Sequence, residues 1–194
     1  MIIGKIVSAS SHVDYVCQVY GLFEVETPPT PADYGFGTFV ALEREGEGYL
    51  VGVIVDTVLV NPEFGNLGPR LSPQAELAVF SPDYLVEKAT LVHIVALGAV
   101  DGRGQVQQGV PIVIAGIDAP VRTLTDAEVR AFHRPGGQFR FAYLPMLTTL
   151  QRPLIAHLAT HILDRLQALF PEEEARLRTL ASHLTWQLRI ASLG

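Results

Sequence analysis

The sequence predicts a mainly β chain with C-terminal helices (α+β): a small closed or partly closed antiparallel β-barrel followed by a two-helix hairpin. Three observations lead to this prediction. Residues 37–60 (GTFVALEREGEGYLVGVIVDTVLV) place two β-branched apolar runs around an acidic turn with two glycines, a pattern typical of a β-hairpin. Short apolar runs, separated by Gly and Pro, precede and follow this hairpin. From residue 147 onward, apolar residues recur at helical spacing instead.

The chain length and composition suit one barrel domain with an appendage. The chain has 194 residues, of which 48% are hydrophobic and only 18% charged. We place the barrel at residues 1–145 and the helical hairpin at 146–194, packed on the barrel or on a partner. No apolar run approaches the ~18–20 residues of a membrane helix. We therefore expect a cytoplasmic protein that does not enter a membrane.

Two strands are predicted before the hairpin. Residues 2–9 form the first, in which Gly4 indicates a bulge or a close backbone approach. Residues 13–20 form the second and contain Cys17, the only cysteine, which we expect to be a small buried hydrophobe. Residues 27–37 carry three prolines and are expected to be a loop.

After the hairpin, residues 61–74 are expected to be a second long loop, because Pro and Gly interrupt them repeatedly. Residues 86–97 form a strand that is buried on both faces. Shorter extended pieces are predicted next, at residues 105–108, 110–115 and 119–122.

A short inserted helix follows, at about residues 125–133. Thr125 and Glu128 have the spacing of a capping box, in which each side chain caps the other's backbone amide. Residues 139–144 (FRFAYL) then alternate in the manner of one more strand.

The two C-terminal helices are predicted from their apolar stripes. The first stripe comprises Ile155, Leu158, Ala159, Ile162, Leu166 and Leu169. The second helix begins near Pro171, where three glutamates face the positive end of the helix dipole. Trp186 and Ile190 fall opposite its main stripe. This helix therefore lies between the barrel and the first helix, or else Trp186 and Ile190 contact another chain.

The sequence contains few motifs for catalysis or ligand binding. We predict that the protein is not an enzyme and binds no cofactor. Neither a phosphate-binding loop nor a GxGxxG pattern occurs. The formal net charge of −6 argues against autonomous nucleic-acid binding. His157 and His161, with Asp164, have a spacing that permits a metal site, but these residue types are also common on the polar face of a helix. They are weak metal candidates.

Candidate interface residues lie on the two long loops. Aromatic, aliphatic and Arg side chains on loops are typical of interface anchors. The residues of this kind are Tyr34, Phe36, Phe64, Leu67 and Arg70.

Three segments resemble the HAS barrel, the small domain that opens HerA-type DNA-translocase ATPases and the α and β subunits of rotary ATP synthases. These segments are residues 2–7 (IIGKIV), residues 37–40 (GTFV) and residues 49–55, within which GVIV is the most similar part. The family's ATPases carry a RecA-like domain after the barrel, whereas about 45 helical residues follow here. The resemblance therefore implies a free-standing barrel, without catalytic residues to carry over.

Two functions are compatible with these sequence features. The first is a non-enzymatic interaction or assembly module, an accessory partner of a HerA-like ATPase or nuclease system. The resemblance also implies self-association. The alternative is a barrel that binds a small molecule or a nucleic acid at its mouth.

Overall fold

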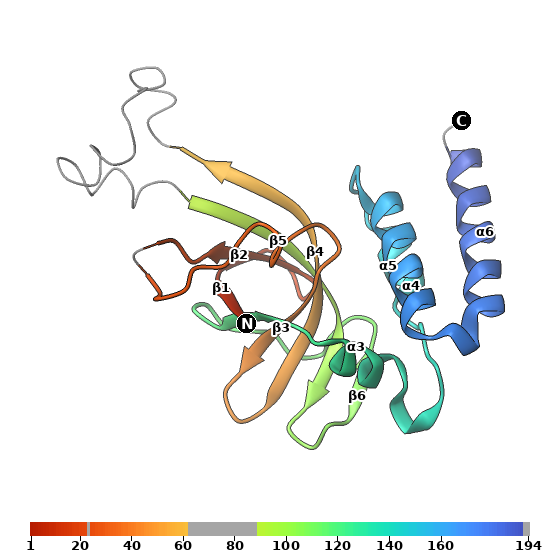
Figure 1. Cartoon of the computed structure of the whole chain (residues 1–194), viewed down its shortest axis with the longest axis horizontal. Helices are drawn as coiled ribbons and strands as arrows, with labels where there is room; N and C mark the ends of the chain where they lie inside the picture. The colour runs from red at the N-terminus through yellow and green to blue at the C-terminus, as the bar shows by residue number, and fades with distance from the viewer. Residues whose placement is uncertain (23, 62–88, 192–194) are drawn as a thin grey trace.

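Six antiparallel strands close into a β-barrel, and helices cover one side of it (Figure 1). The computed structural model describes residues 1–22, 24–61 and 89–191, with side chains as far as residue 184. The sheet order is β2-β1-β7-β3-β4-β5-β6, and a β2–β5 pairing closes the first six strands of this order. The strands are β1 (Ile2–Ala9), β2 (Asp14–Val19), β3 (Phe39–Arg44), β4 (Gly48–Val60), β5 (Ala89–Asp101), β6 (Val106–Gln108) and β7 (Pro120–Thr123).

The predicted hairpin is confirmed as β3 and β4. Its register runs from Phe39 opposite Val53 to Arg44 opposite Gly48. Gly46 and Gly48 in the turn have positive φ, a conformation that glycine adopts without steric cost. One glutamate next to the turn, Glu43, forms an ion pair with Arg122 of β7, in which Nε of Arg122 lies 2.6 Å from Oε1 of Glu43.

The barrel closes through contacts between distant parts of the sequence. Residues 14–18 of β2 pair with residues 91–95 of β5. On its other side β2 pairs with β1, where Gly4 makes the close approach that the sequence predicted. A Cβ atom on Gly4 would lie 2.0 Å from the Gln18 carbonyl oxygen, so only glycine fits there.

Two apolar cores lie on the two sides of the barrel wall. The barrel interior is filled by Ile3, Ile6, Tyr15, Cys17, Val19, Val40, Leu42, Leu50, Ile54, Val92, Ile94, Ala96, Ala115 and Val121. The second core joins the outer face of β3, β4 and β5 to the helices through residues such as Phe39, Val53, Leu97, Leu158 and Ile162. The β5 strand is therefore buried on both faces over residues 94–97, as predicted.

The helices are α3 (Asp126–His133), α4 (Leu144–Thr149), α5 (Ile155–Leu169) and α6 (Glu174–Ala191), with short 3-10 turns η2 (Pro135–Gly137) and η3 (Pro171–Glu173). The capping box at Thr125 and Glu128 is present as predicted. Arg122 bonds both Glu43 of β3 and Glu128 of α3, which ties this helix to the barrel.

The α5 helix lies between the barrel and α6 (Figure 1). The predicted arrangement, in which the last helix lies between the barrel and the first C-terminal helix, is therefore wrong. Leu163, outside the predicted stripe, is fully buried together with Leu158 and Ile162. The α5 helix thus buries a wide apolar surface and occupies the inner position.

The strand predicted at residues 139–144 is also wrong. These residues form an irregular segment that leads into α4. The Gln108 side chain bonds both this segment and α3. Its Nε2 donates to the carbonyls of Arg140 (3.1 Å) and of Phe132 in α3 (2.9 Å), and its Oε1 accepts from the Ala142 amide (2.7 Å). The alternation of Phe139, Phe141 and Tyr143 instead reflects packing of all three rings around His133.

Candidate functional site

An exposed row of aliphatic side chains runs along the segment between β6 and β7. Val110, Ile112, Ile114 and Ile117, which we call the aliphatic strip, are between 54 and 77% exposed. Alternate residues point the other way: Pro111 and Ala115 are buried, and Val113 packs against the barrel interior. The segment therefore has one face on the barrel and one face in solvent.

Hydrogen bonds from the β1–β2 region hold this segment in place. The Pro111 carbonyl accepts a bond from Nδ1 of His12 (3.0 Å), and the Ala115 amide donates to the buried hydroxyl of Tyr15 (3.4 Å). The Asp118 amide donates to the Ile6 carbonyl (2.8 Å). Because these contacts fix the backbone at several points, the strip is presented on an ordered support.

The strip has the properties of a docking surface. Residues 109–117 (GVPIVIAGI) contain no charged residue. β-Branched side chains such as Ile lose little conformational entropy when a partner covers them. Contiguous exposed apolar patches on soluble proteins mark contacts with other molecules.

The predicted interface residues of the first loop contact the protein itself. Tyr34 is half-buried and packs against the barrel interior. The Phe36 ring lies 6.1 Å from the His161 ring of α5, and Gly37 lies directly against that imidazole. This loop therefore attaches α5 to the barrel.

The metal candidates lie at exposed positions of α5. His157, His161 and Asp164 are exposed, and the His161 ring packs on Gly37 and Phe36. Within residues 1–22, 24–61 and 89–191, no group of three or more His, Cys, Asp or Glu side chains is placed to hold a metal ion.

Five further candidate interface residues lie outside the described part of the structure. Phe64, Leu67 and Arg70 fall in the segment 62–88, and the side chains of Trp186 and Ile190 lie beyond residue 184. Their roles stay predictions.

The histidine at the end of α3, His133, was not predicted as a site residue from the sequence. His133 is fully buried, and the rings of Phe39, Phe132, Phe139, Phe141, Tyr143 and Phe170 surround it. Its Nδ1 lies 2.8 Å from the Val129 carbonyl, which can only accept, so Nδ1 carries the proton. Nε2 then accepts from the Tyr143 hydroxyl at 2.8 Å. Burial lowers the pKa of His133 to about 4, so the ring is neutral at pH 7.

Cys17 behaves as the sequence predicted. Its side chain is fully buried in the barrel interior. Burial raises the pKa of the thiol to about 12, so the reactive thiolate form is scarce at neutral pH.

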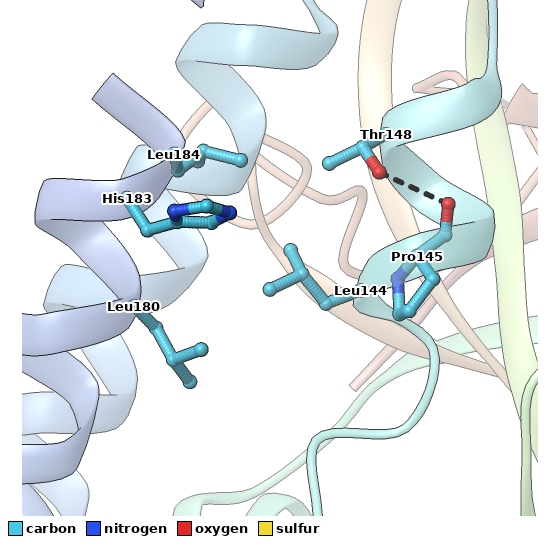
Figure 2. A pocket seen from close by; sticks show the side chains of 6 residues that line it. All are labelled: Leu144, Pro145, Thr148, Leu180, His183 and Leu184. Carbon is cyan, nitrogen blue, oxygen red and sulfur yellow. Dashed lines mark hydrogen bonds between the residues drawn. The ribbon is translucent and has the colours of Figure 1, made fainter. Parts of the chain in front are cut away.

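A groove of about 220 Å³ separates α4 from α6 (Figure 2). Leu144, Pro145 and Thr148 line one side, and Leu180, His183 and Leu184 face them from α6. The Thr148 hydroxyl donates to the Pro145 carbonyl within its own helix, so the groove presents mainly aliphatic surface. No helix of the described residues has the length and apolar character needed to cross a membrane.

The fold and its surface define a closed antiparallel barrel that carries a helical hairpin and presents an aliphatic strip. The chain belongs to the DUF8166 family, a domain of unknown function whose family model matches residues 1–192. No curated protein matches the chain.

One feature of the sequence indicates the aliphatic strip. A half-buried strand has polar residues at alternate positions, whereas residues 110–115 are apolar throughout. Such a run indicates either a strand that is buried on both faces or a strand whose outer face is covered by a partner. Only the structure separates these two cases, because it shows the outer face in solvent.

Proposed function

We propose that this chain is a non-enzymatic docking module, in which the barrel is the scaffold and the aliphatic strip is the contact surface for a protein partner. The observation that carries the proposal is the strip itself: four aliphatic side chains within eight residues, each more than half exposed, on a segment bonded to the barrel. Covering them removes apolar surface from water, the main source of binding free energy in such contacts.

The partner we propose is a HerA-like ATPase. The support for this choice is the resemblance of residues 2–7, 37–40 and 49–55 to the HAS barrel, a domain that supports ring assembly and partner docking in that family. With a formal net charge of −6, we expect the ATPase rather than this chain to contact DNA. The apolar side chains that fill the barrel interior argue against a ligand in the barrel mouth.

The test is binding between this chain and the HerA-like ATPase of the same organism, measured by isothermal calorimetry. The double variant Ile112→Asp and Ile114→Asp is expected to weaken binding at least about tenfold, because two carboxylates would be buried against apolar surface. Leu22→Asp is the matched control, since Leu22 is 65% exposed but lies outside the strip.

Binding by the control variant at the wild-type affinity, together with loss in the double variant, supports the proposal. Absence of binding by the wild-type chain contradicts the choice of partner. Equal binding by all three proteins contradicts the choice of surface.

A further inference from the structure

A cavity of about 250 Å³ lies on the outer face of the barrel, between β4 and the start of α5. The residues that line it are Val55 and Asp56 of β4, together with Arg152, Pro153, Leu154 and Ile155. The lining therefore combines one carboxylate and one guanidinium with four apolar side chains. Sites for drug-sized ligands have volumes of about 300–1,000 Å³, so this cavity suits a smaller molecule.

A β-bulge brings two consecutive residues of β4 to this cavity. In a regular strand, consecutive side chains point to opposite faces of the sheet. The pairing of β4 with β5 shifts its register between Ile54 and Asp56, and both Val55 and Asp56 line the cavity. Bulges re-aim side chains in this way and are common next to functional sites. The strand backbone thus places the Asp56 carboxylate beside the apolar part of the lining.

The Asp56 carboxylate can accept further hydrogen bonds. Its Oδ1 accepts one from the Thr57 amide at 2.8 Å. Among the residues that the structure describes, no basic side chain forms an ion pair with Asp56 and no donor bonds its Oδ2. An ionised carboxylate has about four acceptor positions, so Asp56 has room for the ammonium group of a ligand.

The Arg152 guanidinium, on the α5 side of the cavity, can bind a second carboxylate. Its Nη2 donates to Oδ1 of Asp14, and its other N–H groups have no acceptor among the described residues. Elsewhere in this protein one guanidinium, that of Arg122, bonds both Glu43 and Glu128. The adjoining first turn of α5 has neither a side-chain cap nor an acidic residue, so its positive dipole end adds to the preference for a negative group.

We propose that this cavity binds a free α-amino acid with an aliphatic side chain. The ligand ammonium group binds Asp56, its carboxylate binds Arg152, and its side chain packs on the apolar lining. Asp56 and Arg152 form no ion pair with each other, so each is available to one end of a zwitterion. A simple amine or a simple carboxylic acid satisfies only one of these two charges. The site is separate from the aliphatic strip and goes beyond docking to the ATPase.

Titration of the full chain with L-leucine, followed by ¹H–¹⁵N NMR, tests the proposal. Concentrations up to about 20 mM detect even a millimolar affinity. We expect saturable shifts in the amides of residues 55–57 and 152–157. Three analogues each lack one feature of leucine: glycine lacks the side chain, 3-methylbutan-1-amine the carboxylate and 4-methylpentanoate the ammonium group. Each is expected to bind at least about tenfold more weakly, because one of the three contacts is lost.

The variant Asp56→Asn tests the ammonium contact. It keeps an acceptor for the Thr57 amide but removes the charge, so leucine is expected to bind at least about tenfold more weakly. Asp164→Asn makes the same change at an exposed position of α5 outside the cavity and is expected to bind leucine as the wild type does. An absence of saturable shifts in the wild type, equal binding of any of the three analogues, or unchanged binding by Asp56→Asn overturns the proposal.

Discussion

Replacing His133 with alanine is expected to lower the free energy of unfolding by about 3 kcal/mol or more at pH 7. The variant leaves a cavity among the surrounding aromatic rings and removes the acceptor of the buried Tyr143 hydroxyl. Chemical denaturation monitored by circular dichroism measures the effect. His157→Ala, at an exposed position of α5, is the matched control and is expected to change stability by less than about 0.5 kcal/mol.

The same variant tests the protonation state of His133. Its pKa is about 4 in the folded protein, below the usual 6.5, so between these values the unfolded chain binds more protons. The contribution of the neutral ring is therefore fully present above pH 6.5 and is lost as the pH falls toward 4. The loss amounts to about 3 kcal/mol at pH 4. The stability difference between wild type and His133→Ala should thus shrink from pH 7 to pH 4. A difference that stays constant would show that His133 does not titrate in this way.

Replacing Gly37 with alanine is expected to destabilise the protein by about 3 kcal/mol, through two separable causes. Gly37 has φ of 79°, which costs any other residue energy, and its Cβ would lie 2.2 Å from Cδ2 of His161. Gly46→Ala isolates the first cause, because Gly46 has φ of 71° and nothing within 4 Å of the Cβ position. We expect about 1 kcal/mol for this control.

A double-mutant cycle with His161→Ala isolates the second cause. Removing the imidazole makes room for the added methyl group, so Gly37→Ala should cost about as much in the His161→Ala background as Gly46→Ala does. Urea denaturation of the four proteins of the cycle measures this. If Gly37→Ala costs the same with and without the imidazole, the loop does not attach α5 to the barrel through this contact.

The elements predicted correctly from the sequence are those whose determinants are local. The β3–β4 hairpin combines β-branched runs with turn glycines, and the α3 capping box is complete within four residues. Barrel closure depends on pairing between residues 14–18 and 91–95, which no local pattern indicates. The error at residues 139–144 has the same origin, because the alternating rings pack around a histidine from another element.

The candidate surfaces were harder to predict than the fold. Tyr34 and Phe36 have the composition of interface anchors. In the structure Tyr34 is half-buried against the barrel interior, and Phe36 contacts His161 but is still 36% exposed, so their role as anchors stays a prediction. The exposed residues Ile112 and Ile114 belong to a run whose composition suits a buried strand equally well. Composition indicates what a side chain can contact, whereas the packing of distant segments decides whether it remains available.

The most direct test of the docking proposal is hydrogen–deuterium exchange of residues 109–118, with and without a saturating HerA-like ATPase. We predict that complex formation slows deuterium uptake in this segment, because the partner covers the aliphatic strip and excludes water from its backbone. Formation of the complex with unchanged uptake in residues 109–118 and slower uptake elsewhere would contradict the assignment of the strip as the contact surface.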